Sequence, residues 1–424
     1  MTLVGMDPLA YLFSLEQFGI KFGLENISTI VAALGHPERA FQSVHIAGTN
    51  GKGSVTAMVD AALRAAGHRS ARYTSPHLVD LSERFAIDGR AVDEASLVAA
   101  VDRVRRTVDA LRADGTLDVQ PTFFEVTTAA AFELFRDARV ETAVLEVGLG
   151  GRLDATNVVS PIATAITSIA FDHQLHLGHS LAAIAREKAG IVKPGVPLVV
   201  GPLEPEAEGA IAAIAAARGA PIVHASPADA DGFAVGLPGI HQRANAGVAV
   251  RLLRLLDARG VAVPHDAIAA GLAEPRWPGR LETRRFAGGR ELLLDAAHNP
   301  AGAAALASYL QAEPSGRRPL VFAAMKDKSA REMFGVLLPA VDRLIVTRAS
   351  TRRSADPDAL AAIAREVAPS MAIEVAPVVE DALDRAWRAS PRIVVAGSIF
   401  LLGDVLKLIS RVGAAGAPAG SERT

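Results

Sequence analysis

Cysteine is missing from this 424-residue sequence, and its absence excludes disulfides and thiolate metal sites. A surplus of either charge is missing too, because 44 Lys and Arg residues are balanced by 46 Asp and Glu residues. Without excess positive charge or a local basic patch, we expect no nucleic-acid partner. The sequence also has no apolar run as long as a membrane span and no basic start typical of a signal peptide. We therefore expect a cytoplasmic protein without a membrane partner.

Material for hydrophobic cores, by contrast, is plentiful. Half of the residues (50%) are hydrophobic. A chain of this length normally folds as about two or three domains. Composition therefore predicts a globular, multidomain protein.

The most informative stretch is VHIAGTNGKGS, which spans residues 44–54. Its pattern predicts a buried strand at 44–47, a tight loop at 48–54 and a helix at 55–66 that ends before Gly67. A glycine loop at a helix N-terminus presents backbone N–H groups to anions, and Lys52 adds a positive charge. We expect a phosphate chain to bind there. The match to the Walker pattern is imperfect, since Gly53 separates Lys52 from Ser54, and a plain glycine turn is the alternative.

Two further strands are expected to end in residues that bind metal ions. The strand at 140–147 carries Glu146 at its end, and the strand at 162–169 is followed by Asp172 and His173. Because ligands bind beyond the carboxyl ends of parallel strands, these side chains would reach the same edge as Lys52 and could hold Mg²⁺. Glu146 could instead cap a turn, and His173 could be structural.

Three more segments could contribute to that edge of the sheet. Residues 74–78 (TSPHL) follow a predicted strand at 69–73 and could reach the phosphate site. A helix at 180–191 carries Lys188 near its end, where a lysine is by default a solvated cation. The helix that follows residues 237–245 (LPGIHQRAN) begins with amides that could contact a purine edge or simply form a polar helix start.

A second alternation of strands and helices begins near residue 291. Predicted strands at 291–295, 319–323, 343–347, 372–375 and 392–396 alternate with helices, which indicates a doubly wound parallel sheet. Its first strand has no GxGxxG after it, so nicotinamide binding is disfavoured. We expect an α/β protein with domains at 1–284 and 285–412, followed by a disordered tail at 413–424.

Seven motifs, in order, resemble those of folylpolyglutamate synthase and dihydrofolate synthase, the folate branch of the Mur ligase superfamily. The resemblance as a whole runs from about Gly23 to Val405 and so covers almost the whole chain. The motifs are GTNGKGS at 48–54, TSPHL at 74–78, EVGLGGRLDATN at 146–157, SIAFDH at 168–173, EKAGI at 187–191, WPGRLE at 277–282 and DAAHNP at 295–300.

This resemblance implies an N-terminal P-loop NTPase-like domain, a C-terminal Rossmann-like domain and an ATP-dependent amide ligase. The implied substrates are L-glutamate and either dihydropteroate or a reduced folate, with ATP and two Mg²⁺ ions, in a monomer. The chemistry is sensible, because a carboxylate must be activated as an acyl phosphate before an amine can attack it.

The resemblance also implies roles for individual residues. The family often has glycine where this chain has Ala296, a departure that changes no role. The residues implied to bind the phosphates are Gly48, Thr49, Asn50, Gly51, Lys52, Gly53 and Ser54, and those implied to contact the rest of the nucleotide are Asn245, Arg280, Asp295 and His298. The implied metal ligands are Ser54, Ser75, Glu146, His173 and a carbamylated Lys188. The resemblance assigns the pteridine pocket to Phe124 and Asp154, and catalysis to Lys52, Lys188 and His173.

Other functions remain as alternatives at this stage. A P-loop kinase or GTPase would explain the glycine loop but not the second α/β domain. A non-catalytic nucleotide-binding module would not need two metal-binding strand ends. Another Mur-type ligase could act on a different carboxylate acceptor, although a cell-wall ligase usually carries an extra domain before the P-loop, and only about forty residues precede it here.

Overall fold

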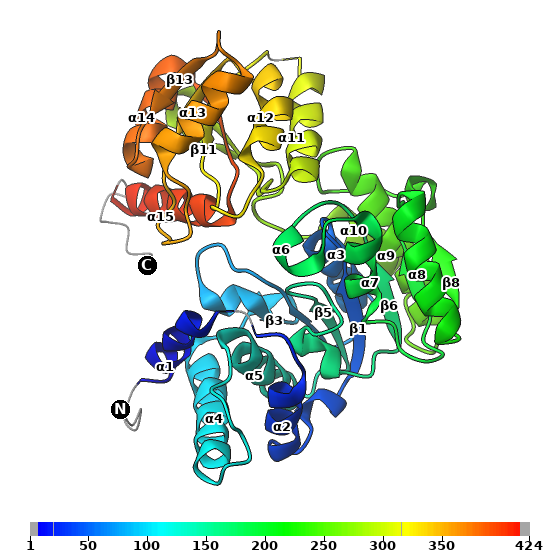
Figure 1. Ribbon diagram of the computed structural model, residues 1–424. Coiled ribbons are helices and arrows are strands. Elements are labelled where there is room, and N and C mark those ends of the chain that lie inside the picture. Colours follow the sequence, from blue (N-terminus) through cyan, green and yellow to red (C-terminus); the bar gives the residue numbers. More distant parts are fainter. Residues whose placement is uncertain (1–6, 20, 315, 416–424) are drawn as a thin grey trace, which may run out of the picture. The chain divides into compact units, whose positions relative to one another are not determined.

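The computed structural model describes residues 7–19, 21–314 and 316–415, which form two compact units. The first unit comprises Met1–His77, Leu81–Leu237 and His241–Trp277. The second comprises Leu78–Asp80, Pro238–Ile240 and Pro278–Thr424. Each unit is an α/β layer structure built on its own largely parallel sheet, as the sequence predicted (Figure 1).

The first unit is built on an eight-stranded sheet with the order β4-β3-β2-β5-β1-β6-β7-β8. The six strands from β2 to β8 in that order run parallel, whereas β3 and β4 form an antiparallel edge that the sequence reading missed. The strands are β1 (Gln42–Ala47), β2 (Ser70–Tyr73), β3 (Phe85–Ile87), β4 (Arg90–Ala91), β5 (Thr142–Glu146), β6 (Ala163–Ile166), β7 (Leu198–Val200) and β8 (Ile222–His224).

Helices cover both faces of this sheet, so its strands are apolar on both sides. One face packs against α3, α9 and α10. The other packs against α1, α2, α4 and α5 near β2 and β5, and against α7 and α8 near β6 and β7. The helices are α1 (Pro8–Ser14), α2 (Glu25–Ala33), α3 (Lys52–Ala65), α4 (Glu94–Ala113), α5 (Phe123–Asp137), α6 (Gln174–Leu177), α7 (Leu181–Ala189), α8 (Pro205–Ala217), α9 (His241–Ala258) and α10 (His265–Ala273).

The second unit is built on a six-stranded sheet with the order β13-β12-β11-β14-β10-β9, in which only β9 is antiparallel. Helices α11, α12 and α13 cover one face, and α14 and α15 cover the other. The elements are β9 (Glu282–Arg285), β10 (Glu291–Leu294), β11 (Leu320–Phe322), β12 (Arg343–Val346), β13 (Ala372–Val375), β14 (Arg392–Ala396), α11 (Pro300–Ala312), α12 (Ala330–Leu337), α13 (Pro357–Val367), α14 (Val379–Ala389) and α15 (Ile399–Ala415).

The short segment Leu78–Asp80 belongs to this second unit although it lies far from it in sequence. Its Leu78 carbonyl oxygen approaches Gly403 of α15 so closely that a Cβ at that position would overlap it. Glycine is therefore required at residue 403 for the segment to pack on the helix.

Two predicted boundaries differ from the structure in ways that affect the site. Helix α3 begins at Lys52 rather than at residue 55, because Gly51, with a φ of 85°, already caps it. Strand β6 ends at Ile166 rather than at residue 169, because Ser168 leaves the sheet to bond the loop after β1.

The expected disordered tail at 413–424 divides between described and undescribed residues. Residues 413–415 complete α15, and residues 416–424 lie outside the described part of the chain. None of the described helices is both long and apolar enough to cross a membrane.

Candidate active site

Four neighbouring strands of the first unit deliver the predicted site residues to one edge of the sheet. In the order β2, β5, β1 and β6, the register pairs Tyr73 with Leu145 and Ala47 with Ile166. Ile46 pairs with Glu146. The strands thus end at the same level, and the loops that follow them leave the sheet side by side, where ligands bind in open parallel sheets.

The loop after β1 is closely packed by its neighbours. Gly48 has a φ of 150°, and a Cβ there would overlap the Thr167 hydroxyl. A Cβ at Gly51 would overlap the side-chain oxygen of Asn245 on α9. Both positions therefore require glycine, and Asn245 does lie against the loop, as expected for a residue of a nucleotide site.

Only part of this loop offers free N–H groups. The Thr49 amide donates to the Ser168 carbonyl at 2.7 Å, and the Asn50 amide donates to the Ser168 hydroxyl at 3.0 Å. The amides of Lys52, Gly53 and Ser54 belong instead to the first turn of α3, where helix geometry provides no acceptor. The candidate anion site is therefore the start of α3 rather than the whole loop, and it has the positive end of the helix dipole behind it.

Two lysines converge on this loop. Lys52 Nζ donates to the carbonyl oxygens of Gly48 and Thr49, both at 3.2 Å. Lys188 Nζ donates to the same Gly48 oxygen at 2.8 Å. Two cationic side chains beside a helix N-terminus form a strongly positive position, which suits a polyanion such as a phosphate chain.

Lys188 is 5% exposed, which excludes the solvated helix-end lysine that was the default reading. Its position follows from close backbone packing between α7 and the glycine run after β5. A Cβ at Gly151 would lie 2.8 Å from the Lys188 carbonyl oxygen, and the Arg152 amide donates to the Glu187 carbonyl at 2.8 Å. The motifs at 146–157 and 187–191 thus form one packed unit that directs Lys188 to the loop.

Glu146 and His173, two of the predicted metal ligands, reach this edge of the sheet from different kinds of position. Glu146 is the last residue of β5 and is 5% exposed, as predicted. His173 does not stand at a strand end: it lies seven residues beyond the end of β6 and caps the short α6 with a φ of 49°. Among the described residues, no three His, Asp or Glu side chains gather as a metal site. A cation there would need further ligands from hydroxyls, phosphates or water.

The remaining predicted residues of the first unit lie on the same edge. Ser54 is buried in the first turn of α3, and Ser75 follows β2 in a cis peptide bond with Pro76. The Phe124 ring, at the start of α5, lies 6.0 Å from the Tyr73 ring and fills the space that a Cβ at Gly148 would need. The partly exposed Phe124 ring therefore borders the end of β5.

Asp154 has a structural task in this loop. Its carboxylate accepts hydrogen bonds from the amides of Gly148 (3.0 Å), Leu149 (2.9 Å) and Thr156 (3.0 Å). Burial raises its pKa, and these hydrogen bonds oppose that shift. Asp154 thus shapes the turn after Glu146, and its contact with a pteridine stays a prediction.

Arg280, Asp295 and His298 lie together in the second unit. Asp295 accepts hydrogen bonds from the amides of Leu281 and Ala297, both at 2.9 Å. Burial raises the pKa of Asp295, and the positive charge of Arg280 opposes that shift. His298 Nδ1 lies 2.8 Å from the Ala296 carbonyl oxygen, which can only accept, so Nδ1 carries the proton and Nε2 is the acceptor of the neutral ring.

Sequence reasoning gave no role to Thr167 or Trp277. Thr167 Oγ1 donates to the Asn50 carbonyl at 2.6 Å, and the Trp277 ring covers Gly53 so closely that a Cβ there would overlap it. The departure from the Walker pattern at Gly53 was the available signal for Trp277. Nothing local marked Thr167, because its contact depends on the strand order.

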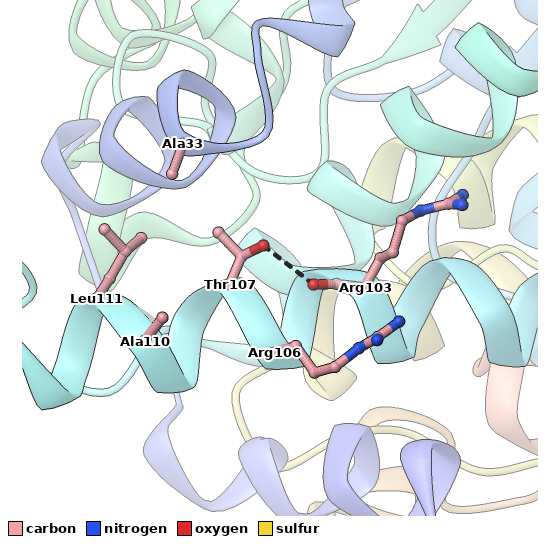
Figure 2. Close-up of a pocket in the computed structure, with 6 residues that line it drawn as sticks. All are labelled: Ala33, Arg103, Arg106, Thr107, Ala110 and Leu111. Carbon is pink, nitrogen blue, oxygen red and sulfur yellow. Dashed lines mark hydrogen bonds between the residues drawn. The ribbon is translucent and has the colours of Figure 1, made fainter.

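A hollow between α2 and α4 lies apart from these residues. Figure 2 shows Arg103 and Arg106 extending beside it. Arg103 pairs with Glu133 at 2.8 Å and with Asp137, and Arg106 pairs with Asp102 at 3.1 Å. Because carboxylates already neutralise both guanidinium groups, the hollow is a poor anion site. It is lined by Ala33, Arg103, Arg106, Thr107, Ala110 and Leu111.

Comparison with known sequences gives consistent matches. Residues 279–399 match the family model described as Mur ligase, glutamate ligase domain. The Bacillus subtilis protein named dihydrofolate synthase/folylpolyglutamate synthase is 36% identical over 352 residues, which cover 77% of this chain and 81% of that protein. A Haloferax volcanii protein named "Probable bifunctional folylpolyglutamate synthase/dihydropteroate synthase" is 36% identical over 94% of this chain. The chain spans only about half (50%) of that relative's length.

Solved structures agree over nearly the whole chain. Mycobacterium tuberculosis folylpolyglutamate synthase, complexed with ADP and AMPPCP, has a TM-score of 0.85 and 35% identity over 96% of this chain and 99% of that chain. A bifunctional folylpolyglutamate synthase/dihydrofolate synthase with Mn, AMPPNP and L-glutamate bound has a TM-score of 0.83 and 30% identity, covering 96% and 98% of the two chains.

Proposed function

Because the chain belongs to the dihydrofolate synthase/folylpolyglutamate synthase family, we propose that it is an ATP-dependent ligase that joins L-glutamate to a pteroate or folate carboxylate. The observation that carries this proposal is the convergence of Lys52 and Lys188 on the Gly48 carbonyl at the N-terminus of α3. A site with two cations and free amides is suited to the phosphates of ATP.

The reaction has two steps. An oxygen of the acceptor carboxylate attacks the γ-phosphorus of ATP and ADP leaves, which gives an acyl phosphate. The amine of L-glutamate then attacks the acyl carbon, and phosphate and a proton leave as the amide forms. Lys52 and the first-turn amides of α3 offset the negative charge on the transferred phosphoryl group. No nucleophilic side chain is needed, so the lack of cysteine is no obstacle.

Glu146, His173, Ser54 and Ser75 are the residues that would hold divalent cations, and we propose two Mg²⁺ ions. A relative with Mn and AMPPNP bound supports a metal at the nucleotide. When bound, the metal offsets charge on the phosphates. We also propose that Lys188 is carbamylated, because a carbamate would convert one of two adjacent cations into a metal ligand.

In the first unit, Asn245, whose side chain lies against the loop after β1, is proposed to contact the nucleotide. For Arg280, Asp295 and His298 of the second unit, a role in nucleotide binding is likewise a proposal. Support for these second-unit residues comes from the position of Asp295 and His298 directly after β10, from the charge of Arg280 acting on Asp295, and from the match of residues 279–399 to the glutamate ligase model. Phe124 and Asp154 are proposed to line the pteridine pocket, and the partly exposed Phe124 ring beside the end of β5 supports this.

A phosphate-release assay with ATP, Mg²⁺ and L-glutamate tests the function and identifies the acceptor. Dihydropteroate and tetrahydrofolate are compared, and release is expected only when both an acceptor and L-glutamate are present. Lys52→Ala should lower kcat at least about a hundredfold, roughly 2.7 kcal/mol of transition-state stabilisation. Release without an acceptor would instead indicate a simple NTPase. Turnover with D-glutamate or a UDP-linked sugar peptide would indicate another Mur-type ligase.

A further inference from the structure

Arg84 is a buried cation that the proposed mechanism does not yet use. It ends the short turn Leu81–Arg84 before β3 and is 8% exposed. Its carbonyl oxygen accepts a hydrogen bond from the Thr74 amide at 3.0 Å, which fixes it beside the end of β2. It therefore lies at the same edge of the sheet as the candidate active site.

The hydrogen-bond partners of Arg84 are uncharged groups, and one of them is the side chain of Tyr73. Its Nε donates to His77 Nδ1 at 3.0 Å, and its Cζ lies 5.2 Å from the centre of the Phe123 ring. Within the described residues it forms no ion pair with a carboxylate, whereas buried charges are normally paired. A guanidinium without a paired carboxylate is suited to binding an anionic ligand.

The groups that face Arg84 indicate which anion this is. Burial lowers the pKa of Arg84, and Tyr73, Glu16 and Glu146 oppose that shift, so Glu146 lies within electrostatic range. Arg84 also contacts the Phe123 ring, and the neighbouring Phe124 ring is partly exposed and lies 6.0 Å from the buried Tyr73 ring. Arg84 thus lies close to aromatic rings at the start of α5 and to the charge of Glu146 at the end of β5.

We propose that Arg84 binds the acceptor carboxylate that ATP phosphorylates. This inference rests on the proposed function and names the residue that orients the attacking oxygen. An acceptor whose aromatic rings pack on the surface around Phe124 would present its carboxylate between Arg84 and Glu146. The planar guanidinium matches a carboxylate in a bidentate arrangement and continues to offset negative charge when one oxygen becomes the bridge of the acyl phosphate.

Binding measurements without ATP test this directly. The affinity of the enzyme for dihydropteroate is compared with that for its carboxamide, which keeps the rings but lacks the charge. The wild type should bind the carboxylate at least about tenfold more tightly. Arg84→Gln should bind both compounds with nearly equal affinity. Arg106→Gln removes a guanidinium that is 67% exposed on α4, so it should keep the wild-type preference.

Steady-state kinetics provide a second measurement with a conservative variant. Arg84→Lys keeps the charge but not the bidentate geometry, so it should raise KM for the acceptor about tenfold or more. KM for ATP and for L-glutamate should change by less than about twofold. If KM for glutamate or ATP rises instead, Arg84 binds another group and the proposal is wrong.

The outcomes separate this inference from the proposed function. A wild type that binds neither compound and releases no phosphate contradicts the proposed function itself. A wild type that binds both equally, or an Arg84→Gln variant that keeps the preference, overturns the role of Arg84 alone. Circular dichroism checks whether Arg84→Gln folds. If it does not, the wild-type preference for the carboxylate over the carboxamide, together with the acceptor KM of Arg84→Lys, still tests the role of Arg84.

Discussion

The backbone carbonyl oxygen of Gly48 holds two lysine side chains of the candidate site close together. This oxygen accepts hydrogen bonds from both Lys52 and Lys188, so two like charges are held within a few ångströms of each other. Like charges at such distances repel, and an anion between them removes the repulsion. Either a bound phosphate or a change in the charge of one lysine would reduce this repulsion.

Substitution of Lys188 distinguishes these two possibilities. If Lys188 is carbamylated and binds metal, Lys188→Ala should lose metal-dependent turnover, and added acetate should restore part of it by occupying the vacated ligand position. Lys188→Arg should not be rescued, because it fills the space with a permanent cation. The measurement is phosphate release with and without acetate. Full activity of Lys188→Ala, or the mass of an unmodified lysine in the intact protein, would contradict carbamylation.

His45 provides a test of how burial affects stability. It is fully buried in β1, its Nε2 lies 2.8 Å from Thr156 Oγ1, and its pKa is lowered to about 3 by burial and by the charge of Lys193. The unfolded chain takes up a proton near pH 6.5, whereas the folded chain does so only near pH 3. The stabilisation is therefore complete above about pH 6.5 and is lost as the pH falls, by up to about 1.4 kcal/mol per pH unit.

His45→Gln keeps a donor for Thr156 but does not titrate. Its free energy of unfolding, measured by urea denaturation at about pH 7, 6 and 5, should fall less steeply than that of the wild type. The raised pKa of Asp154 acts in the opposite direction, but it is common to both proteins and cancels in the comparison. Parallel pH profiles would show that His45 is protonated in the folded state.

Residue-level predictions from the sequence succeeded where one strand end determined the position. Glu146 follows directly from an apolar strand, and Lys52 from a glycine turn before a helix. Arg84 and Thr167 could not be predicted, because their positions depend on which strands are neighbours. His173 was misplaced because the apolar run at 162–169 was read as one strand, although its last residues bond to the loop after β1.

Helix α3 shows at the level of the element why a motif departs from its usual pattern. Gly53 lies in its first turn under the Trp277 ring. Helix propensity alone would favour alanine there by about 1 kcal/mol. Gly53→Ala should nevertheless destabilise the protein by roughly 1–3 kcal/mol, because the added methyl group overlaps the indole.

The control for this substitution is Gly209→Ala in α8, where nothing lies within 4 Å of the added atom. That variant should be more stable by roughly 0.5–1 kcal/mol. Both are measured by urea denaturation, and Trp277→Leu should relieve part of the Gly53→Ala penalty. Equal effects of the two glycine substitutions would show that the Trp277 ring moves aside at little cost.

Helices and strands were predicted well where a hydrophobic pattern extends over many residues. They were predicted poorly where a short strand pairs antiparallel with its neighbour. The helix at 204–217 and the parallel strands of the second sheet, β10 to β14, were recognised within a few residues. The hairpin β3–β4 and strand β9 were missed, because such short segments carry no period of their own and form only beside an existing sheet edge.

At the scale of the whole molecule, the two units have separate cores and each contains one of the two tryptophans. Trp277 lies in the first unit, and Trp387 lies in the second, 6.4 Å from the Phe286 ring. We expect urea unfolding followed through Trp277 (in Trp387→Phe) and through Trp387 (in Trp277→Phe) to give different midpoints. Superimposable transitions with the same midpoint would show that the units unfold together.

The assignment of Leu78–Asp80 to the second unit, where it packs on Gly403, has a consequence for how this gene could be recombined. A crossover at the boundary between residues 277 and 278 would transfer most of the C-terminal domain but leave this tripeptide behind. The chimaera would then have to pack a foreign α15 on a segment that it had not inherited. The segment from residue 278 onward is therefore not self-sufficient, and exchanges between relatives should succeed only when residues 78–80 and the other outlying segment of this unit, 238–240, travel with it.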